Sequence, residues 1–143
     1  MKVVVDTNVL VAGLLSSFGP PGEILRMIAS GTLRLCFDAR ILTEYEEVLA
    51  RSKFRFNTEQ TQALMEHIEA EGVSVAGNPL ALRLPDPSDE PFLESAVAGK
   101  AECLITGNTR HFPPGKRQEM AILSPREFLD YYRKRSMPRT GKR

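Results

Sequence analysis

The stretch Met1-Lys2-Val3-Val4-Val5-Asp6-Thr7-Asn8-Val9-Leu10 decides the fold class of this chain. Its three consecutive valines are β-branched and uncharged, which is typical of a short buried strand. Apolar residues resume at positions 9–15 and indicate a buried helix directly after the strand. Asp6 then lies at the carboxyl end of a central strand, where open α/β sheets bind their ligands. Since a buried carboxylate is costly unless it is paired, hydrogen-bonded or bound to metal, Asp6 is a candidate functional residue.

A simpler role for Asp6 is open at this point. Aspartate is among the preferred residues at the N-cap of a helix, and the sequence Asp-Thr-Asn offers good capping chemistry. On the first 15 residues alone, capping and a functional role are equally well supported. The rest of the chain has to distinguish them.

Strand and helix signals alternate along the chain, and this order favours parallel βαβ architecture. Strand-like segments cover residues 2–6, 33–37, 73–75, 101–106 and 121–123. Helical patterns begin near residues 8, 20, 39, 58, 88 and 125. In a doubly wound sheet, the strands that end near residues 5, 37 and 105 have their carboxyl ends along one edge.

The 143 residues are most simply one domain, and 42% hydrophobic with 26% charged residues is ordinary for a globular protein. No apolar run approaches the ~18 residues of a membrane-spanning helix, and the N-terminal segment lacks the basic region of a signal peptide. Cys36 and Cys103 lie in apolar strand-like segments without CxxC spacing, so both are expected to be buried and reduced. These features predict a cytoplasmic protein with no membrane partner.

Charge is unevenly distributed along the chain. Residues 133–143 hold six basic and no acidic residues, which leaves 13 basic and 18 acidic residues, a net charge of −5, in residues 1–132. Basic tails often contact nucleic acid, although a solvated, frayed terminus is the simpler interpretation of a segment that contains Ser, Pro, Thr and Gly. The predicted organisation is one domain over residues 1–132 and a flexible basic tail over residues 133–143.

Further candidate residues lie near the ends of predicted elements. Glu44 is in the first turns of the helix after Asp38, at the edge of its apolar stripe, from where it can reach the rim of a cleft. By itself, Glu44 is better explained as an acid that interacts favourably with the N-terminal end of the helix dipole. Asn108 follows a predicted strand, where its amide oxygen is suited to bind or orient a ligand, or simply belongs to a turn after Gly107.

Three carboxyl groups occur within five positions at the start of another helix, namely Asp86, Asp89 and Glu90. Aspartate and serine are normal turn and cap residues, but three acids exceed what capping needs, and a hard divalent cation would relieve their repulsion. With the other acids at the same sheet edge, they suit Mg²⁺- or Mn²⁺-dependent hydrolysis of a phosphodiester. No Ser-His, Cys-His or Gly-rich phosphate-binding pattern competes, and His67 and His111 are expected at the surface.

Four short motifs, in this order, resemble the PIN-domain nucleases, in particular those that act as VapC-like toxins. The motifs are Val3-Val-Val-Asp-Thr-Asn-Val-Leu, Leu42-Thr-Glu-Tyr-Glu-Glu-Val-Leu, Asp86-Pro-Ser-Asp-Glu-Pro-Phe-Leu-Glu and Ala101-Glu-Cys-Leu-Ile-Thr-Gly-Asn-Thr-Arg-His-Phe-Pro. They span residues 3–113, which is most of the chain. The resemblance implies a PIN-like three-layer α/β/α fold with a central parallel sheet of about five strands.

The resemblance also implies which residues form the site. Asp6 corresponds to the first acid of the family and Glu44 to the second. Asp89 is the best match for the third, while an alignment shift of one residue would favour Glu90. Asp86 is expected to assist Asp6 and Asp89 in binding metal.

The fourth acidic position of the family is frequently aspartate, and it is Asn108 here. This loss of a charge implies that a second metal ion binds weakly or only together with substrate. Asn8 and Thr106 are expected to orient the carboxylates.

The function implied by the resemblance is that of a Mg²⁺- or Mn²⁺-dependent endoribonuclease. Such a protein is often a homodimer and the toxin of a toxin–antitoxin pair, neutralised by a small antitoxin protein. Asn108 supports a second hypothesis, a non-catalytic PIN module that binds RNA or an antitoxin, because a missing carboxylate weakens metal affinity. A phosphatase of the haloacid dehalogenase type is less well supported, since Asp6-Thr-Asn lacks the second aspartate two residues on.

Overall fold

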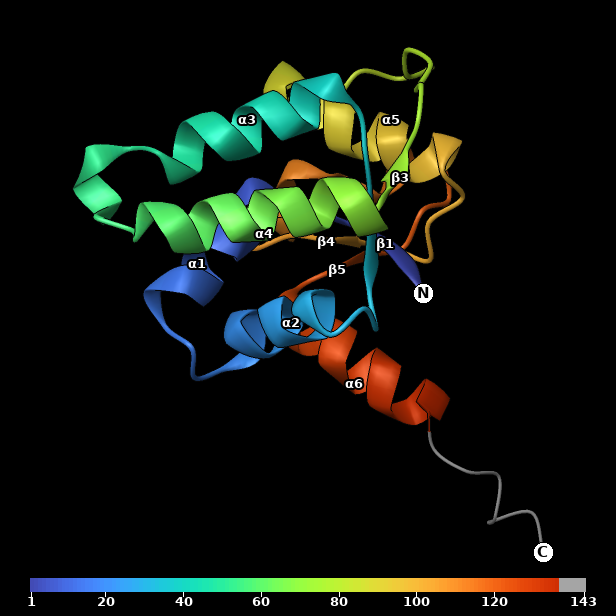
Figure 1. Ribbon diagram of the computed structural model, residues 1–143. Coiled ribbons are helices and arrows are strands. Elements are labelled where there is room, and N and C mark those ends of the chain that lie inside the picture. Colours follow the sequence, from blue (N-terminus) through green and yellow to red (C-terminus); the bar gives the residue numbers. More distant parts are fainter. Residues whose placement is uncertain (137–143) are drawn as a thin grey trace, which may run out of the picture.

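The computed structural model describes residues 1–136 and arranges them in three layers (Figure 1). The central sheet is entirely parallel, in the order β3-β2-β1-β4-β5, and consists of β1 (Lys2–Val5), β2 (Arg34–Phe37), β3 (Val73–Ser74), β4 (Leu104–Ile105) and β5 (Ile122–Leu123). The α-helices of the described residues are α1 (Thr7–Leu15), α2 (Pro20–Ala29), α3 (Ala39–Leu49), α4 (Thr58–Glu71), α5 (Glu90–Ala98) and α6 (Pro125–Ser136). The predicted three-layer α/β/α fold with a five-stranded parallel sheet is confirmed.

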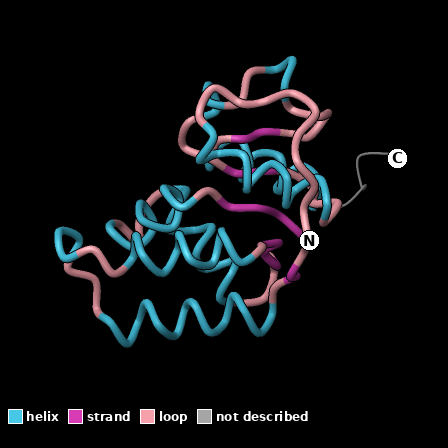
Figure 2. Tube along the Cα trace, turned by 90° about the horizontal axis from the view of Figure 1, so that it is seen from above, coloured by secondary structure: helices cyan, strands magenta, loops and turns pink. Residues whose placement is uncertain are grey.

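The helices cover both faces of this sheet. In Figure 1, α3 and α5 lie above the strands, α2 and α6 lie below them, and α4 passes in front of them. In the view from above (Figure 2), helices lie on both sides of the strand that starts at the N-terminus. Val3, Val4 and Val5 are accordingly inaccessible to solvent, because a parallel strand with helices on both faces has no solvent-facing side. None of the described helices is long and apolar enough to cross a membrane.

Strand β1 is the central strand of the sheet. The strands that follow it in sequence lie on one side of it up to β3 and on its other side from β4 onward. It pairs with β2 on one side, with Val3 opposite Leu35, and with β4 on the other, with Val5 opposite Ile105. The chain therefore proceeds outward from β1 through β2 and β3, and then returns to β4. Adjacent strand ends at such a reversal leave room for a ligand site, and Asp6 follows β1 at this place.

Two helices begin at their predicted positions near residues 39 and 125, and each has a side-chain cap. Asp38 caps α3, and its Oδ1 atom accepts a hydrogen bond from the Ile41 backbone N–H at 3.0 Å. Ser124 and Glu127 form a reciprocal capping box at the start of α6, with hydrogen bonds of 2.8 and 3.1 Å. Strand β4 is shorter than the predicted segment 101–106, although the Glu102 backbone N–H still donates to the Lys2 carbonyl of β1.

The basic segment 133–143 begins inside α6 rather than after it. Helix α6 extends to Ser136, so the first part of the predicted tail is helical. Arg133 pairs with Glu23 of α2 at 3.2 Å, and Arg135 pairs with Glu102 at 2.6 Å. Residues 137–143, the remainder of the predicted tail, lie outside the described residues.

Tyr45 connects α3 to the centre of the sheet. Its ring is fully buried beside Phe92 of α5, and its hydroxyl donates to the Val5 carbonyl at 2.5 Å. Tyr45→Phe is expected to lower the free energy of unfolding by about 1–2 kcal/mol, because the buried carbonyl loses this donor. Urea unfolding monitored by circular dichroism measures the loss. Tyr131→Phe, which removes an exposed hydroxyl contact to Glu102, is the matched control and is expected to stay within about 0.5 kcal/mol of wild type.

Candidate active site

Asp6 lies between β1 and α1, and its carboxylate faces β4. It occupies the N-cap position of α1, but its side chain makes no capping hydrogen bond. Instead, Asp6 Oδ2 accepts a hydrogen bond from Thr106 Oγ1 at 2.8 Å, and Asn8 Nδ2 is 3.5 Å away. Capping therefore does not explain Asp6. Thr106 and Asn8 contact its carboxylate, as their expected orienting role requires.

The buried Asp6 carboxyl group is held in an environment that disfavours its charge. The side chain is almost completely buried, and this burial raises its pKa from 3.8 to about 6. The hydrogen bond from Thr106 lowers the pKa, while the negative charges of Asp89 and Glu44 raise it further. Asp6, Glu44 and Asp89 are thus close enough to influence one another electrostatically.

Glu44 reaches the same region from α3. It is half-buried, and its Oε2 atom accepts a hydrogen bond from the Thr7 hydroxyl. Thr7 is the first residue of α1 and directly follows Asp6. The contact turns Glu44 toward the junction of β1 and α1. An acid that only interacts with the dipole of α3 would not need to point there.

Asp89 closes the short 3-10 turn Pro87–Asp89 that precedes α5. Its Oδ2 atom is buried and accepts no hydrogen bond from the described residues, although His111 Nδ1 is 3.2 Å away and forms an ion pair with it when protonated. Burial raises the pKa of Asp89, and the neighbouring Asp86 charge raises it further, whereas His111 lowers it. Asp89 is therefore a buried carboxylate whose basic neighbour is His111.

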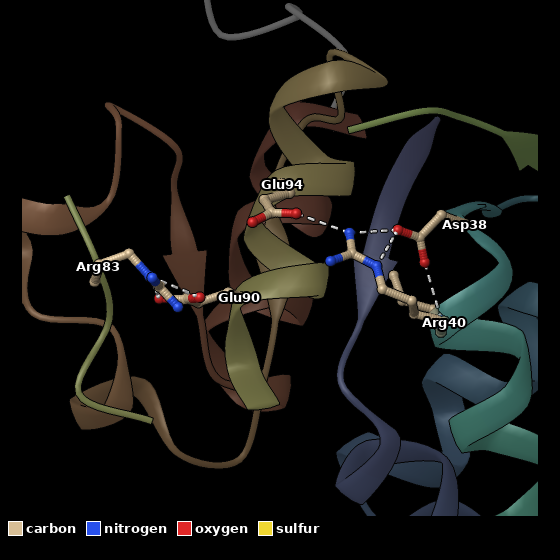
Figure 3. Close-up of polar contacts among 6 residues, drawn as sticks. Asp38, Arg40, Arg83, Glu90 and Glu94 are labelled. Atoms are coloured by element: carbon tan, nitrogen blue, oxygen red, sulfur yellow. Dashed lines mark hydrogen bonds and ion pairs between the residues drawn. The ribbon is translucent and has the colours of Figure 1, made fainter. Parts of the chain in front are cut away.

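The other two acids of this segment have partners of their own. Asp86 Oδ1 accepts hydrogen bonds from the Ser88 backbone N–H at 2.9 Å and from its hydroxyl at 2.8 Å, which is ordinary capping geometry. Glu90 accepts from Arg83 Nε and, at 2.9 Å, from the Leu84 backbone N–H, and Figure 3 shows the pair with Arg83 on the side of α5. These contacts favour Asp89 as the third acid of the site and leave Asp86 as an accessory candidate.

The loop after β4 forms the rim of the site. The Asn108 backbone N–H donates to Thr106 Oγ1 at 3.0 Å, and the Gly107 backbone N–H donates to Asn8 Oδ1 at 3.2 Å. Asn108 itself is exposed, and its side chain caps no helix. Residues 107–111 line a polar hollow of about 550 Å³. His111, which lines this hollow, is 3.2 Å from Asp89, whereas Asp6, Glu44 and Asp89 do not line it themselves.

Two neighbours of the acids were not predicted from the sequence. His111 is exposed as expected, but its contact with Asp89 joins segments 22 positions apart and has no local signal. Thr7 belongs to the Asp-Thr-Asn stretch, yet its bond to Glu44 spans 37 positions. The sequence thus shows a hydroxyl group at position 7, but it does not show that this group contacts Glu44.

The donor atoms fit a hard divalent cation in chemical type. Asp6 has only neutral donors, Thr106 and Asn8, as hydrogen-bond partners, and Asp89 has a buried oxygen without a hydrogen bond. Carboxylate oxygens are the ligands that Mg²⁺ and Mn²⁺ prefer. In residues 1–136, no three Asp, Glu, His or Cys side chains are already close enough together to hold a metal ion. A bound cation would therefore have to draw the carboxylates together.

Comparison with known families adds an independent finding. The family model described as PIN domain matches residues 2–110 of the chain. Neither the curated proteins nor the solved structures contain a significant match.

Proposed function

The chain belongs to the PIN-domain family, and on this premise we propose that it is an endoribonuclease that uses Mg²⁺ or Mn²⁺ at the site formed by Asp6, Glu44 and Asp89. PIN domains are generally nuclease modules. The observation that carries the proposal is the convergence of these three acids, from β1, α3 and the start of α5, on the carboxyl edge of the sheet. Acids that lie close together in a largely buried site repel one another, and a bound cation would relieve this repulsion.

Each residue has a definite task in this proposal. Asp6 and Asp89 supply the carboxylates that hold the cation, Asp86 assists them, and Glu44 holds the proton that leaves the attacking water. When bound, the cation activates water and stabilises the charge that develops on the scissile phosphate. Thr106 keeps the Asp6 carboxylate turned toward the site through its 2.8 Å hydrogen bond. Thr7 restrains Glu44 in the same way.

The wider biological role follows the VapC-like branch of the family. We propose that the protein is the toxin of a toxin–antitoxin pair in the cytoplasm, that it forms a homodimer, and that a small antitoxin protein blocks its acidic site. RNA is the proposed substrate. The basic segment 133–143 is the proposed contact for the RNA backbone, with residues 1–132 as the nuclease domain.

A second candidate function rests on Asn108. Its neutral amide occupies the position of a fourth acid, and no ready-made metal cluster exists in residues 1–136. A PIN module that binds RNA or an antitoxin without cleaving it would have both features. The two candidates differ in a simple property, since the module has no need to bind a divalent cation.

Cleavage of a panel of single-stranded and structured RNAs tests the proposed function. The purified protein is expected to cut RNA with Mn²⁺, to stop when EDTA is added, and to resume when Mn²⁺ is supplied in excess, because the acids need a cation to act. Gel electrophoresis of end-labelled RNA reports the cuts. Intact RNA across the panel, together with no Mn²⁺ binding by calorimetry, would favour the binding module.

A further inference from the structure

Two arginine–glutamate pairs flank α5 (Figure 3). Arg83, in the loop before α5, binds Glu90 at 2.9 Å, and Arg40, near the start of α3, binds Glu94 at 2.7 Å. The Glu90 and Glu94 side chains are buried to a similar degree, at 8% and 9% exposure, whereas both arginines are half-exposed or more. The two pairs therefore have the same chemistry on the same helix and differ in the elements that they join.

The pair formed by Arg40 joins two helices. Arg40 Nε and Nη2 donate to Asp38 Oδ2 at 2.9 and 2.6 Å, and Nη2 also donates to Glu94 Oε1. Asp38 in turn caps α3 through the Ile41 backbone N–H. One guanidinium group thus fixes the first turn of α3 to the second turn of α5. Arg83 connects α5 only to the loop that precedes it.

The two joined helices carry acids of the candidate site. Glu44 is one helical turn after Arg40 on α3, and Asp89 immediately precedes α5. Their like charges repel each other, and the Arg40 ion pair adds a polar contact between the two helices to the packing of Tyr45 on Phe92. We propose that Arg40 is a positioning residue that holds Glu44 and Asp89 at the separation needed to bind a divalent cation. The proposal rests on the proposed function and adds a residue that acts through Glu44 and Asp89.

Simple electrostatics predicts the opposite effect of replacing Arg40. Removal of a positive charge makes the surrounding potential more negative, which favours a cation. Weaker metal binding by an Arg40→Met variant would therefore indicate lost positioning and not lost charge. The double variant Arg40→Met/Glu94→Gln removes one positive and one negative charge, so its net charge equals that of wild type. Tyr45 and Phe92, with ring centroids 6.5 Å apart, keep α3 and α5 packed in these variants.

Calorimetric titration with Mn²⁺ tests the proposal. Arg40→Met and the double variant are expected to bind Mn²⁺ about tenfold more weakly than wild type, the scale of losses at supporting residues of metal sites. Arg83→Met, the matched control, is expected to stay within about twofold. Wild-type affinity or tighter binding in Arg40→Met, or an equal loss in Arg83→Met, would overturn the positioning role.

Hydrogen exchange of the metal-free protein supplies a readout that needs neither metal nor RNA. Amides in the first turn of α3 are expected to exchange faster in Arg40→Met than in Arg83→Met, and equal exchange in the two variants would refute the connection between α3 and α5. A wild-type protein that binds no Mn²⁺ would refute the proposed function and the positioning role together. Wild-type binding that Arg40→Met leaves unchanged would refute the positioning role alone.

Discussion

An Asp6→Asn variant is expected to lose RNA cleavage by a factor on the order of a thousand, which is the scale of removing a central catalytic group. The substitution keeps the size of the side chain and an oxygen that accepts the hydrogen bond from Thr106. It removes only the charge that is proposed to hold the cation. Cleavage rates of end-labelled RNA at saturating Mn²⁺ measure the loss.

The control for this variant is Asp130→Asn. Asp130 lies on α6 with its side chain 62% exposed, and its replacement removes the same charge from a position outside the site. Wild-type rates are expected for Asp130→Asn. Undiminished cleavage by Asp6→Asn would remove Asp6 from the mechanism, and equal losses in both variants would indicate an effect of net charge alone.

The fold was largely predictable because its signals are local. The valines of β1 are β-branched and buried on both faces, and the helices that Asp38 and Ser124 cap begin near the predicted residues 39 and 125. Strand lengths were less predictable. Strands β4 and β5 have two residues each, because pairing with a neighbouring strand, which the sequence of one segment does not contain, determines where a strand ends.

The candidate site was predictable in outline for a different reason. Strand order follows from the alternation of elements, so the sequence indicated that acids after β1 and near β2 share one edge. It left Glu90 as an alternative to Asp89, since an alignment shift of one residue exchanges the two. The contacts of Glu90 with Arg83 and Leu84, which favour Asp89, are visible only in the structure. The link between Arg40 and Glu94 spans 54 positions, which explains why no local pattern revealed it.

The same Asp6→Asn variant is expected to be more stable than wild type without metal, by up to roughly 3 kcal/mol above pH 7. The folded protein holds the Asp6 proton up to a pKa of about 6, whereas an ordinary aspartate releases it near 3.8. Below pH 3.8 both states keep the proton and Asp6 carries no penalty. Between pH 3.8 and about 6 the unfolded state has already released the proton that the folded state still holds, so the free energy of unfolding of the wild-type protein falls through this window and levels off near pH 7.

The difference between the two unfolding free energies isolates Asp6, because the lowered pKa values of Glu90 and Glu102 affect both proteins alike. Urea unfolding at intervals from pH 4 to 8, with EDTA, is expected to show the advantage of Asp6→Asn growing through this window. Asp89 shares the region, so the two carboxyl groups titrate as a coupled pair and broaden the rise. A constant difference across the window would show that burial of the Asp6 charge is not what the metal-free fold has to overcome.

Mn²⁺ should remove most of this difference in stability. A cation at one hundred times its dissociation constant stabilises the folded state by about 2.7 kcal/mol, an amount similar to the penalty of the ionised Asp6. Wild type is therefore expected to regain its stability with Mn²⁺ above pH 6, while Asp6→Asn does not respond. The ionised Asp6 carboxylate would then have two effects. Its charge destabilises the metal-free fold, and the same charge attracts the cation. An equal response of both proteins to Mn²⁺ would separate metal binding from Asp6.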